Sequence, residues 1–337
     1  MRAVAFKKPG PIDREDALVD VDLPDPEPGE DDLLVRVRAV SVNPVDVKVR
    51  AGMRPATGDW RVLGFDAAGE VVATGANVTG FAPGDHVWYA GQIDRPGSNA
   101  ELQCVDHRIA ARKPATLGWA EAAAMPLTTI TAWEALFDKL EVTRDVPGSA
   151  RAVMIVNGAG GVGSMAIQLL RARTDLTVIA SASRDETVAW VKELGAHHVV
   201  THREAMAPQV EALALGRPGH VFSTTHTDEH LKDIVELIAP QGRLALIDDP
   251  KMLDATALKG KALSLHWELM FTRPLFKTAD MAEQGKLLAE VARMVDAGEV
   301  RSTLTETFGT IDAANLKRAH ALIESGRARG KVVLVGW

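Results

Sequence analysis

The chain has 337 residues, enough for two ordinary domains, and its hydrophobic content of 46% supports sizeable cores. Its net charge of −7 argues against nucleic acid or an anionic membrane as a partner, since both need a basic surface. The single cysteine, Cys104, excludes an internal disulfide and is typical of a small buried hydrophobe rather than a nucleophile. With no signal or membrane-spanning segment in view, we expect a cytoplasmic protein.

The first part of the chain, to about Pro114, is predicted to form short strands between turns. Residues 32–42, "DLLVRVRAVSV", alternate apolar and charged side chains as a half-buried strand does. Residues 69–78 and 84–91 indicate further strands that end at glycine turns. We therefore expect a β-rich, barrel-like domain over residues 1–126, with the acidic, proline-containing segment 13–32 as a solvated edge and loop.

After this domain the pattern changes to helices and then to alternating strands and helices. Residues 117–140 show helical spacing with an interruption at Pro126. Strands are then expected at residues 151–157, 176–183, 197–201, 220–225, 242–248 and 261–267, with helices in the first four of the intervals between them. Such alternation predicts an α/β fold in which a doubly wound parallel sheet carries helices on both faces, over residues 127–268. Residues 269–337 add helices near 286–296 and 313–324 and a strand at 330–336, which we expect to return to the first domain.

A cluster of glycines follows the first of these strands. Gly158, Gly160 and Gly163 have the spacing G-x-G-x-x-G, between a buried strand and an amphipathic helix. In this context the first glycine allows a tight turn, the second lets the backbone approach a pyrophosphate, and the third lets the helix pack on the strand. We therefore predict that residues 158–163, Gly161 and Val162 included, bind a dinucleotide. The alternative is a tight turn with a structural role only.

The end of the next strand bears on the choice of cofactor. Sites for NAD usually place an acidic residue there, whereas this chain has Ser181, Ala182, Ser183 and Arg184. Hydroxyls and a guanidinium bind a 2′-phosphate, which a carboxylate would repel. Ser181, Ser183 and Arg184 therefore favour NADP(H), unless Arg184 is merely a solvated residue at a helix start.

Several stretches resemble the medium-chain dehydrogenase/reductase superfamily, in the family's order. They are "AVSVNPVDVKVRAG", "LGFDAAGEVVATGANV", "FAPGDHVW", "GSNAELQ", "AAAMPLTTITAWEAL", "NGAGGVGSMAIQLL", "VKELGAHHVV" and "GKVVLVG". The chain looks closest to the quinone oxidoreductase branch, and within it to zinc-type alcohol dehydrogenase-like proteins. The resemblance implies a GroES-like catalytic domain, a Rossmann domain, a cleft between them, and a homodimer in which residues 261–267 are the edge strand.

The chain departs from zinc alcohol dehydrogenases at the metal ligands. Those enzymes have a cysteine where this chain has Asn43, and Gly-His-Glu where it has Gly64, Phe65 and Asp66; their third ligand falls near residues 125–126. The four clustered cysteines of the structural zinc lobe are also absent between residues 89 and 102. A catalytic zinc needs three protein ligands, so we expect no zinc.

One other metal pattern exists outside those positions. His226 and His230, spaced i, i+4 with Asp228 between them, would share a face of a helix. They lie where a strand ends and a helix begins, and capping or solvated surface explains them as well.

A metal-free site must stabilise negative charge on the acceptor oxygen with hydrogen-bond donors. In zinc-less relatives an Asn-x-x-Asp-x-x-x-Arg segment lines the cleft, and here it is Asn43, Asp46 and Arg50. We nominate Asn43 and Tyr89 as donors, with Lys48, which stands where many relatives have a tyrosine, as a third candidate. The alternatives are that Asn43 holds the turn before Pro44 and that Tyr89 is a packing residue.

The resulting hypothesis is an NADPH-dependent reductase that transfers a hydride to a quinone or an α,β-unsaturated carbonyl compound. Trp60, Phe65 and Trp267 are candidate walls of the substrate site, and Thr128 and Thr129 are expected at the nicotinamide end. Two alternatives stay open: a zinc-dependent alcohol dehydrogenase, and a non-catalytic NADPH-binding sensor.

Overall fold

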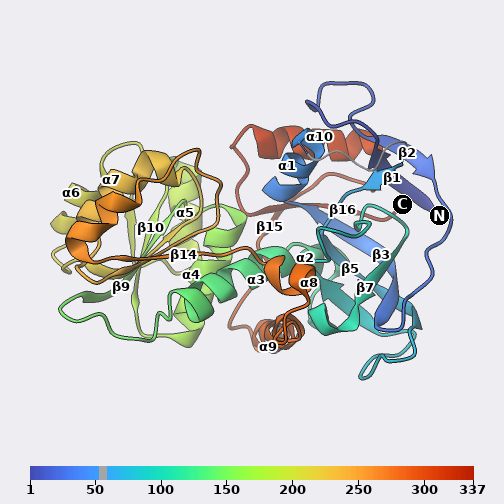
Figure 1. Cartoon of the computed structure of the whole chain (residues 1–337), viewed down its shortest axis with the longest axis horizontal. Helices are drawn as coiled ribbons and strands as arrows, with labels where there is room; N and C mark the ends of the chain where they lie inside the picture. The colour runs from blue at the N-terminus through green and yellow to red at the C-terminus, as the bar shows by residue number, and fades with distance from the viewer. Residues whose placement is uncertain (53–58) are drawn as a thin grey trace. The chain divides into compact units, whose positions relative to one another are not determined.

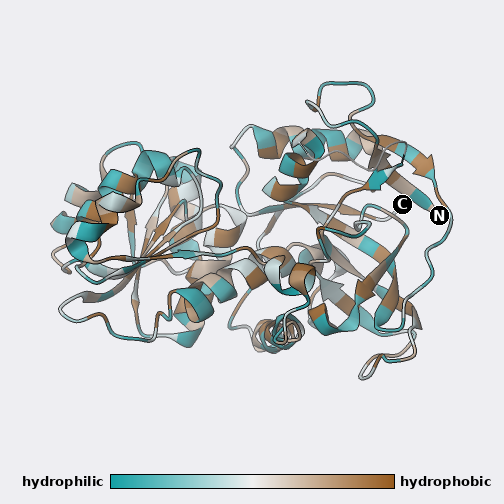
Figure 2. Cartoon of the chain, viewed as in Figure 1, coloured by the Kyte–Doolittle hydropathy of each residue, from teal (hydrophilic) through white to brown (hydrophobic). Residues whose placement is uncertain are grey.

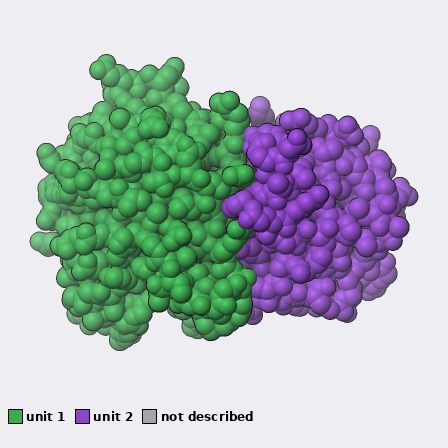
Figure 3. Space-filling model, turned by 180° about the vertical axis from the view of Figure 1, so that it is seen from behind, with its two compact units in different colours: residues 1–127, 271–337 green, residues 128–270 purple. Residues whose placement is uncertain are grey.

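The computed structural model describes residues 1–52 and 59–337, which form two compact units (Figure 1; Figure 3). Unit 1 comprises Met1–Leu127 and Phe271–Trp337, and unit 2 comprises Thr128–Met270. These bounds lie within two residues of the predicted domain bounds. Among the described residues, no helix has the length and apolar character that a membrane crossing requires.

Unit 1 is β-rich, as predicted. A seven-stranded sheet has the order β15-β16-β3-β5-β6-β8, with β7 also paired to β3, and a three-stranded sheet has the order β2-β1-β4. The C-terminal β16 pairs antiparallel with β3, so the end of the chain returns to the first domain. The strands are β1 (Arg2–Phe6), β2 (Val19–Asp22), β3 (Asp32–Val42), β4 (Arg61–Val62), β5 (Asp66–Thr74), β6 (His86–Tyr89), β7 (Leu102–Asp106), β8 (Ala110–Arg112), β15 (Leu304–Thr307) and β16 (Lys331–Val335).

Helices of unit 1 lie in its first part and in the returning segment. The expected interruption at Pro126 is present, because α2 ends at Ala123 and α3 begins with the proline, whose missing N–H costs nothing in the first helical turn. The helices are α1 (Pro44–Gly52), η1 (His107–Ile109), α2 (Trp119–Ala123), α8 (Thr272–Phe276), α9 (Glu283–Asp296) and α10 (Ala313–Glu324), and α3 (Pro126–Trp133) leads into unit 2.

Unit 2 is a parallel sheet of six strands in the order β11-β10-β9-β12-β13-β14. The order reverses at β9, which is the doubly wound arrangement that the alternating pattern predicts. Its elements are η2 (Glu134–Lys139), β9 (Ala150–Val156), α4 (Gly161–Arg173), β10 (Thr177–Ser181), α5 (Asp185–Glu193), β11 (His198–Val200), α6 (Met206–Ala212), β12 (Pro218–Ser223), α7 (Thr227–Leu237), β13 (Arg243–Leu246), η3 (Ala255–Lys261) and β14 (Ser264–Trp267).

Hydropathy accounts for the layers of unit 2. Figure 2 shows apolar strands inside this unit and helices striped with polar and apolar residues around them. The strands are buried on both faces, as Met154, Val221 and Leu244 illustrate, so they read as apolar runs rather than as alternation. The predicted fold class, a GroES-like domain with a Rossmann-like parallel sheet, is confirmed.

Candidate active site

The glycine turn joins β9 to α4 at the carboxyl edge of the parallel sheet. Val156 ends the strand, Gly160 is the N-cap, and Gly161 begins the helix. The left-handed residue of the turn is Asn157, with φ of 59°, and the first glycine of the motif, Gly158, does not have a positive φ. Asparagine tolerates this conformation because its short polar side chain bonds locally, so Gly158 is needed for another reason.

That reason is close packing. A Cβ atom at Gly158 would lie 2.8 Å from the Cβ of Ala180 on the neighbouring strand, and one at Gly163 would lie 2.6 Å from the carbonyl oxygen of Asn157. A Cβ at Gly160 would meet nothing closer than the Asn157 Nδ2, at 3.2 Å. Two of the glycines therefore let the helix approach the sheet, and Gly160 leaves space beside the turn.

The first turn of α4 presents backbone hydrogen-bond donors beside the space at Gly160. Gly161, Val162 and Gly163 form that turn, where backbone N–H groups have no acceptor within the helix. The same end of the helix carries a partial positive charge. The geometry therefore suits a pyrophosphate, and the binding of one here stays a prediction.

Ser181, at the end of β10, is buried and faces the turn. Its Oγ accepts a hydrogen bond of 2.8 Å from the Asn157 N–H and lies 3.0 Å from the Nδ1 of His202. Its hydroxyl therefore supports the left-handed residue. The predicted contact of Ser181 with a 2′-phosphate stays a prediction, and it would require these bonds to be exchanged.

Ser183 and Arg184 are only partly buried at the start of α5. The Nε of Arg184 lies 2.8 Å from an Oε1 of Glu186, so the guanidinium already has an acidic neighbour. Thr187, in the first turn of α5, accepts a hydrogen bond of 3.0 Å at its Oγ1 from the Arg184 N–H. Binding a phosphate through Arg184 would mean competing with Glu186 for the same side chain.

Three histidines gather at the carboxyl end of the sheet in unit 2. His202, which the sequence reasoning missed, follows β11, and its ring centroid lies 6.2 Å from that of His230. Burial, and then the neighbouring His230, lower the pKa of His202, which favours the neutral ring. The backbone of His226 is in the left-handed conformation, and its Nδ1 lies 2.8 Å from the Thr225 Oγ1. Within residues 1–52 and 59–337, no three His, Cys, Asp or Glu side chains are grouped to hold a metal.

Thr128 and Thr129 lie on α3, and both are buried. The Oγ1 of Thr129 has no hydrogen-bond partner in the part of the chain that the structure describes. A buried hydroxyl without a partner is rare in folded proteins and is a group that a bound ligand would satisfy.

A group of buried polar residues in unit 1, which we call the polar cluster, consists of Asn43, Asp46, Asp66 and Lys331. The Nδ2 of Asn43 donates to the Oδ2 of Asp66 at 2.8 Å and, at 3.4 Å, to the Ser41 carbonyl. The Nζ of Lys331 lies 3.0 Å from the same Oδ2 and also donates to the Oδ1 of Asn43. The Asn43 amide is therefore used within the cluster, so its nomination as a donor to substrate stays a prediction.

Asp46 completes the cluster from α1. It accepts hydrogen bonds from the backbone N–H groups of Asn43, at 2.8 Å, and Gly64, at 3.1 Å. Burial raises the pKa of Asp46 to about 7, against the opposing effect of these bonds. This carboxyl group thus holds together the segments that carry Asn43 and Phe65.

Lys331 was not found by sequence reasoning. It is the first residue of β16, in the segment "GKVVLVG", which was read only as a closing strand. The available signal was a lysine in an apolar strand, since lysine is rarely buried without a partner. Its partners lie 265 and 288 positions away, and no local pattern predicts them.

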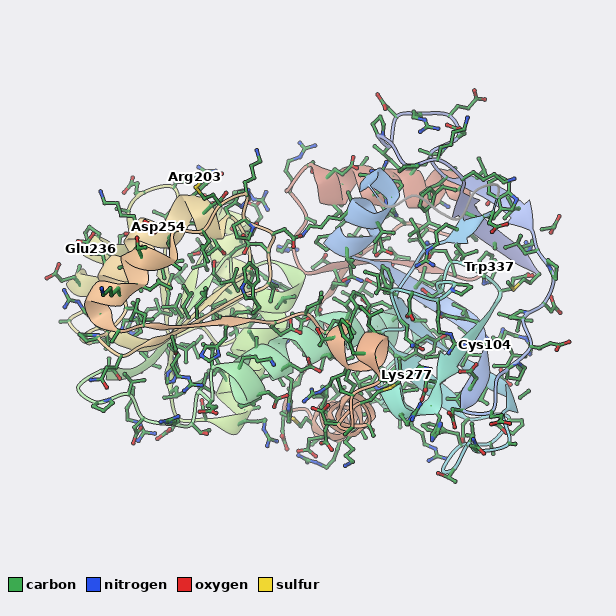
Figure 4. The ribbon with its side chains drawn as sticks, viewed as in Figure 1. Cys104, Arg203, Glu236, Asp254, Lys277 and Trp337 are labelled. Atoms are coloured by element: carbon green, nitrogen blue, oxygen red, sulfur yellow. The ribbon has the colours of Figure 1, made fainter. Side chains whose placement is uncertain are left out.

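Tyr89 and Cys104 lie close together in the unit 1 sheet. Tyr89 is buried, its hydroxyl donates to the Oε1 of Gln103 at 2.9 Å, and burial raises its pKa. Cys104 is half-buried on β7 (Figure 4), and burial raises the pKa of its thiol to about 11. A protonated thiol is a poor nucleophile. The catalytic role of Tyr89 stays a prediction.

The remaining nominated residues differ in their exposure. Lys48 is exposed on α1, and Trp60 is partly exposed beneath the ammonium of Lys7, which lies 4.4 Å from its ring centroid. Phe65 is buried, with its ring 4.9 Å from that of Phe271. Trp267 is 52% exposed at the end of β14 in unit 2. Figure 4 also labels three charged residues of unit 2 that are exposed at its surface, Arg203, Glu236 and Asp254.

Together, the β-rich unit and the six-stranded parallel sheet with its glycine turn define the two-domain fold of dehydrogenases and reductases. Residues 29–134 match the alcohol dehydrogenase GroES-like domain, and residues 194–334 match the zinc-binding dehydrogenase family. The chain belongs to the medium-chain dehydrogenase/reductase superfamily, and it is an oxidoreductase of that superfamily.

Relatives match the whole chain. The zinc-type alcohol dehydrogenase-like protein SAR2277 of Staphylococcus aureus (strain MRSA252) is 38% identical over 99% of both chains. The human mitochondrial NAD(P)H oxidoreductase RTN4IP1 is 30% identical over 90% of this chain and 81% of its own length. A crystal structure from Rhizobium etli CFN 42, named provisionally as a zinc-dependent alcohol dehydrogenase protein, is 61% identical, with a TM-score of 0.99 over 100% of this chain and 98% of that chain. The quinone oxidoreductase from Coxiella burnetii is 27% identical, with a TM-score of 0.80 over 100% of this chain and 99% of that chain.

Proposed function

We propose that the protein is an NADPH-dependent reductase that transfers a hydride to a quinone or to the β-carbon of an α,β-unsaturated carbonyl compound, without catalytic zinc. The observation that carries the proposal is the polar cluster, where Asn43 and Asp66 bind a lysine ammonium. The likeness to a quinone oxidoreductase supports the acceptor class, and the relative named as an NAD(P)H oxidoreductase supports the nicotinamide cofactor.

The residues of unit 2 fit a nicotinamide dinucleotide. Gly160 leaves room beside the first turn of α4 for the pyrophosphate, and the Thr129 hydroxyl has no partner among the described residues. The end of β10 has no acidic residue, which supports a cofactor with a 2′-phosphate, and Ser183 and Arg184 are the residues that we expect to bind it. When bound, NADPH supplies the hydride.

The residues of unit 1 do not fit a catalytic zinc ion. Phe65 has no ligating atom, Asn43 offers only an amide, and the Asp66 carboxylate is already paired with Lys331. Catalytic zinc needs three nitrogen, sulfur or oxygen ligands together with an open position. We therefore assign no step to a metal.

The protein's own residues have modest chemical work in this reaction. The first turn of α4 binds and orients the cofactor, and the buried side chains exclude water from the site. The polar cluster fixes the loop that carries Asn43. Hydride addition to a quinone or enone leaves an enolate or a phenolate-type oxygen, which solvent can protonate. This reaction requires no dedicated acid among the side chains.

The direct test is NADPH oxidation by the purified protein with a panel of quinones, enones and aldehydes, before and after dialysis against a zinc chelator. We expect quinone or enone reduction that survives the chelator. Stoichiometric zinc on which activity depends would instead establish the zinc-dependent alcohol dehydrogenase. Tight NADPH binding without turnover of any acceptor would establish the sensor.

The cofactor assignment has its own test in Arg184→Ala. Loss of the guanidinium should raise KM for NADPH by about tenfold or more, as expected for loss of a charge-assisted phosphate contact, and leave KM for NADH within about threefold. Glu186→Ala is the matched variant, because it removes the acidic neighbour of Arg184 and should lower KM for NADPH. Equal changes for both cofactors would show that Arg184 does not bind the phosphate.

We also propose a homodimer formed through β14. Among the described residues this strand is at the edge of its sheet, paired with β13, and Trp267 and Leu269 are more than half exposed beside it. An edge strand with exposed apolar side chains beside it is a ready surface for pairing with a second copy. Trp267→Asp should give a monomer in light scattering, whereas Met252→Asp, which changes another exposed apolar residue of unit 2, should leave a dimer.

A further inference from the structure

The ammonium of Lys331 is enclosed like a bound cation. Its side chain is 3% exposed, and Nζ has three acceptors: the Val42 carbonyl at 3.1 Å, the Asp66 Oδ2 at 3.0 Å, and the Asn43 Oδ1. An ammonium group has three N–H donors, so every one is satisfied. A carbonyl, a carboxylate and an amide oxygen are also the ligands that hard cations take.

Acceptors of this ammonium stand in segments where the resemblance places zinc ligands. Two of its acceptors belong to Asn43 and Asp66, and these are the positions where the resemblance places a cysteine ligand and the Gly-His-Glu segment of zinc enzymes. The cation of the cluster is therefore part of the polypeptide, brought from the distant strand β16.

Asp66 connects this cation to the start of α3. Its Oδ2 accepts from Lys331 and Asn43, while its Oδ1 accepts from the Leu127 N–H at 2.7 Å. Leu127 lies in the first turn of α3, where the helix dipole favours a negative charge. Thr128 and Thr129, the expected nicotinamide contacts, are the next two residues of that helix.

We propose that Lys331 is the fixed cation of this site in place of a metal ion, and that it is a positioning residue for hydride transfer. It pairs with the Asp66 carboxylate and orients the Asn43 amide, and through the Asp66–Leu127 bond it fixes the start of the helix that carries the two threonines. All three N–H groups are used, so Lys331 acts through these residues and not on the substrate. The role in hydride transfer rests on the proposed function, whereas the replacement of the metal does not.

Metal analysis tests the replacement without any activity. The purified protein, incubated with equimolar Zn²⁺ and desalted, should retain well under one zinc per chain by atomic emission. One zinc retained per chain would overturn the proposal. This measurement stands even if the protein reduces none of the acceptors, which would refute only the proposed function.

Lys331→Met tests the positioning role. Each rate is divided by the concentration of NADPH-binding sites found by fluorescence titration, so that loss of folded protein does not count. We expect kcat to fall by about tenfold or more while Kd for NADPH stays within about threefold, because the pyrophosphate site in unit 2 is untouched. Lys113→Met is the control: this lysine of unit 1 also donates to two carbonyls, at 3.0 and 2.6 Å, but lies outside the cluster. Its kcat should not change.

If Lys331→Met does not fold, the double variant Lys331→Met/Asp66→Asn replaces it. This variant removes both charges and leaves no buried carboxylate without a counter-charge. It should melt at a higher temperature than Asp66→Asn or Lys331→Met alone and still show the loss of kcat. A kcat within about threefold of the wild type, in whichever variant folds, would overturn the positioning role.

Discussion

His320 should make the protein sensitive to mild acid, and the size of the effect can be worked out from its surroundings. The side chain lies on α10, is fully buried, and neither ring nitrogen has a hydrogen-bond partner among the described residues. Burial, and then the nearby Arg50 guanidinium, lower its pKa from 6.5 to about 3. The folded protein therefore keeps this ring neutral where the unfolded chain would protonate it.

The direction of the change in stability with pH follows from proton uptake. Between pH 6.5 and about 3 the unfolded state binds more protons at His320 than the folded state, so stability falls as the pH falls through this window. Each pH unit below the pKa of this histidine in the unfolded chain lowers the free energy of unfolding by about 1.4 kcal/mol. The loss is therefore about 2 kcal/mol at pH 5 and almost nothing at pH 7.5. The figure at pH 5 depends little on the folded pKa, provided that it lies below about 4.

His320→Leu isolates the effect, because the two proteins share every other titrating group. Urea unfolding followed by circular dichroism gives the free energy of unfolding at pH 7.5 and pH 5.0. The difference between the variant and the wild type should shift by about 2 kcal/mol in favour of the variant at the lower pH. The exposed His86→Gln, also in unit 1, is the control and should show no such gain. A gain below about 0.5 kcal/mol, or one of opposite sign, would refute the account of His320 as a buried neutral ring.

Other predictions concern the two candidate sites. Gly163→Ala should destabilise unit 2 by about 1–3 kcal/mol in thermal unfolding, because its Cβ has no space, whereas Gly160→Ala should keep stability and lose NADPH affinity in fluorescence titration. Tyr89→Phe tests the nominated donor: a loss of kcat well beyond about threefold would establish Tyr89 as a catalytic donor, and a kcat within about threefold would show that the hydroxyl serves only its bond to Gln103. Thr129→Val should leave the melting temperature of the free protein unchanged or raised and weaken NADPH binding; unchanged binding would remove this hydroxyl from the cofactor site.

Local patterns in the sequence were enough to predict most of unit 2. Strand and helix periodicities are short-range properties, and buried parallel strands such as Ala150–Val156 stand out as apolar runs. The glycine spacing was equally readable, although the turn residue itself was not. Asn157 adopts the left-handed conformation because the Ser181 hydroxyl, 24 positions away, accepts from its N–H, and this pairing is set by the sheet.

The polar groups of unit 1 were much less predictable, because their partners are distant in the chain. Arg50 was read as part of a segment that lines a cleft, yet its guanidinium is buried and bonds to the Gly10 carbonyl and to Glu324 on α10. Asn43 was read as a donor to substrate, yet its amide is held by Asp66 and Lys331. In each case the resemblance pointed to the residue, and the fold shows which groups of the chain bind its side chain.

The chemistry of the polar cluster also restricts the acceptor. A zinc ion with an open position can bind and polarise a carbonyl oxygen, but the Lys331 ammonium has no donor left for one. Acceptors that need strong polarisation, such as simple aldehydes and ketones, should therefore react slowly. Quinones are electron-poor without assistance, and enones accept hydride at a carbon remote from the oxygen. We expect kcat/KM with NADPH to fall in the order quinone, enone, aldehyde, and an aldehyde that is reduced as fast as a quinone would mean that some other group polarises the oxygen.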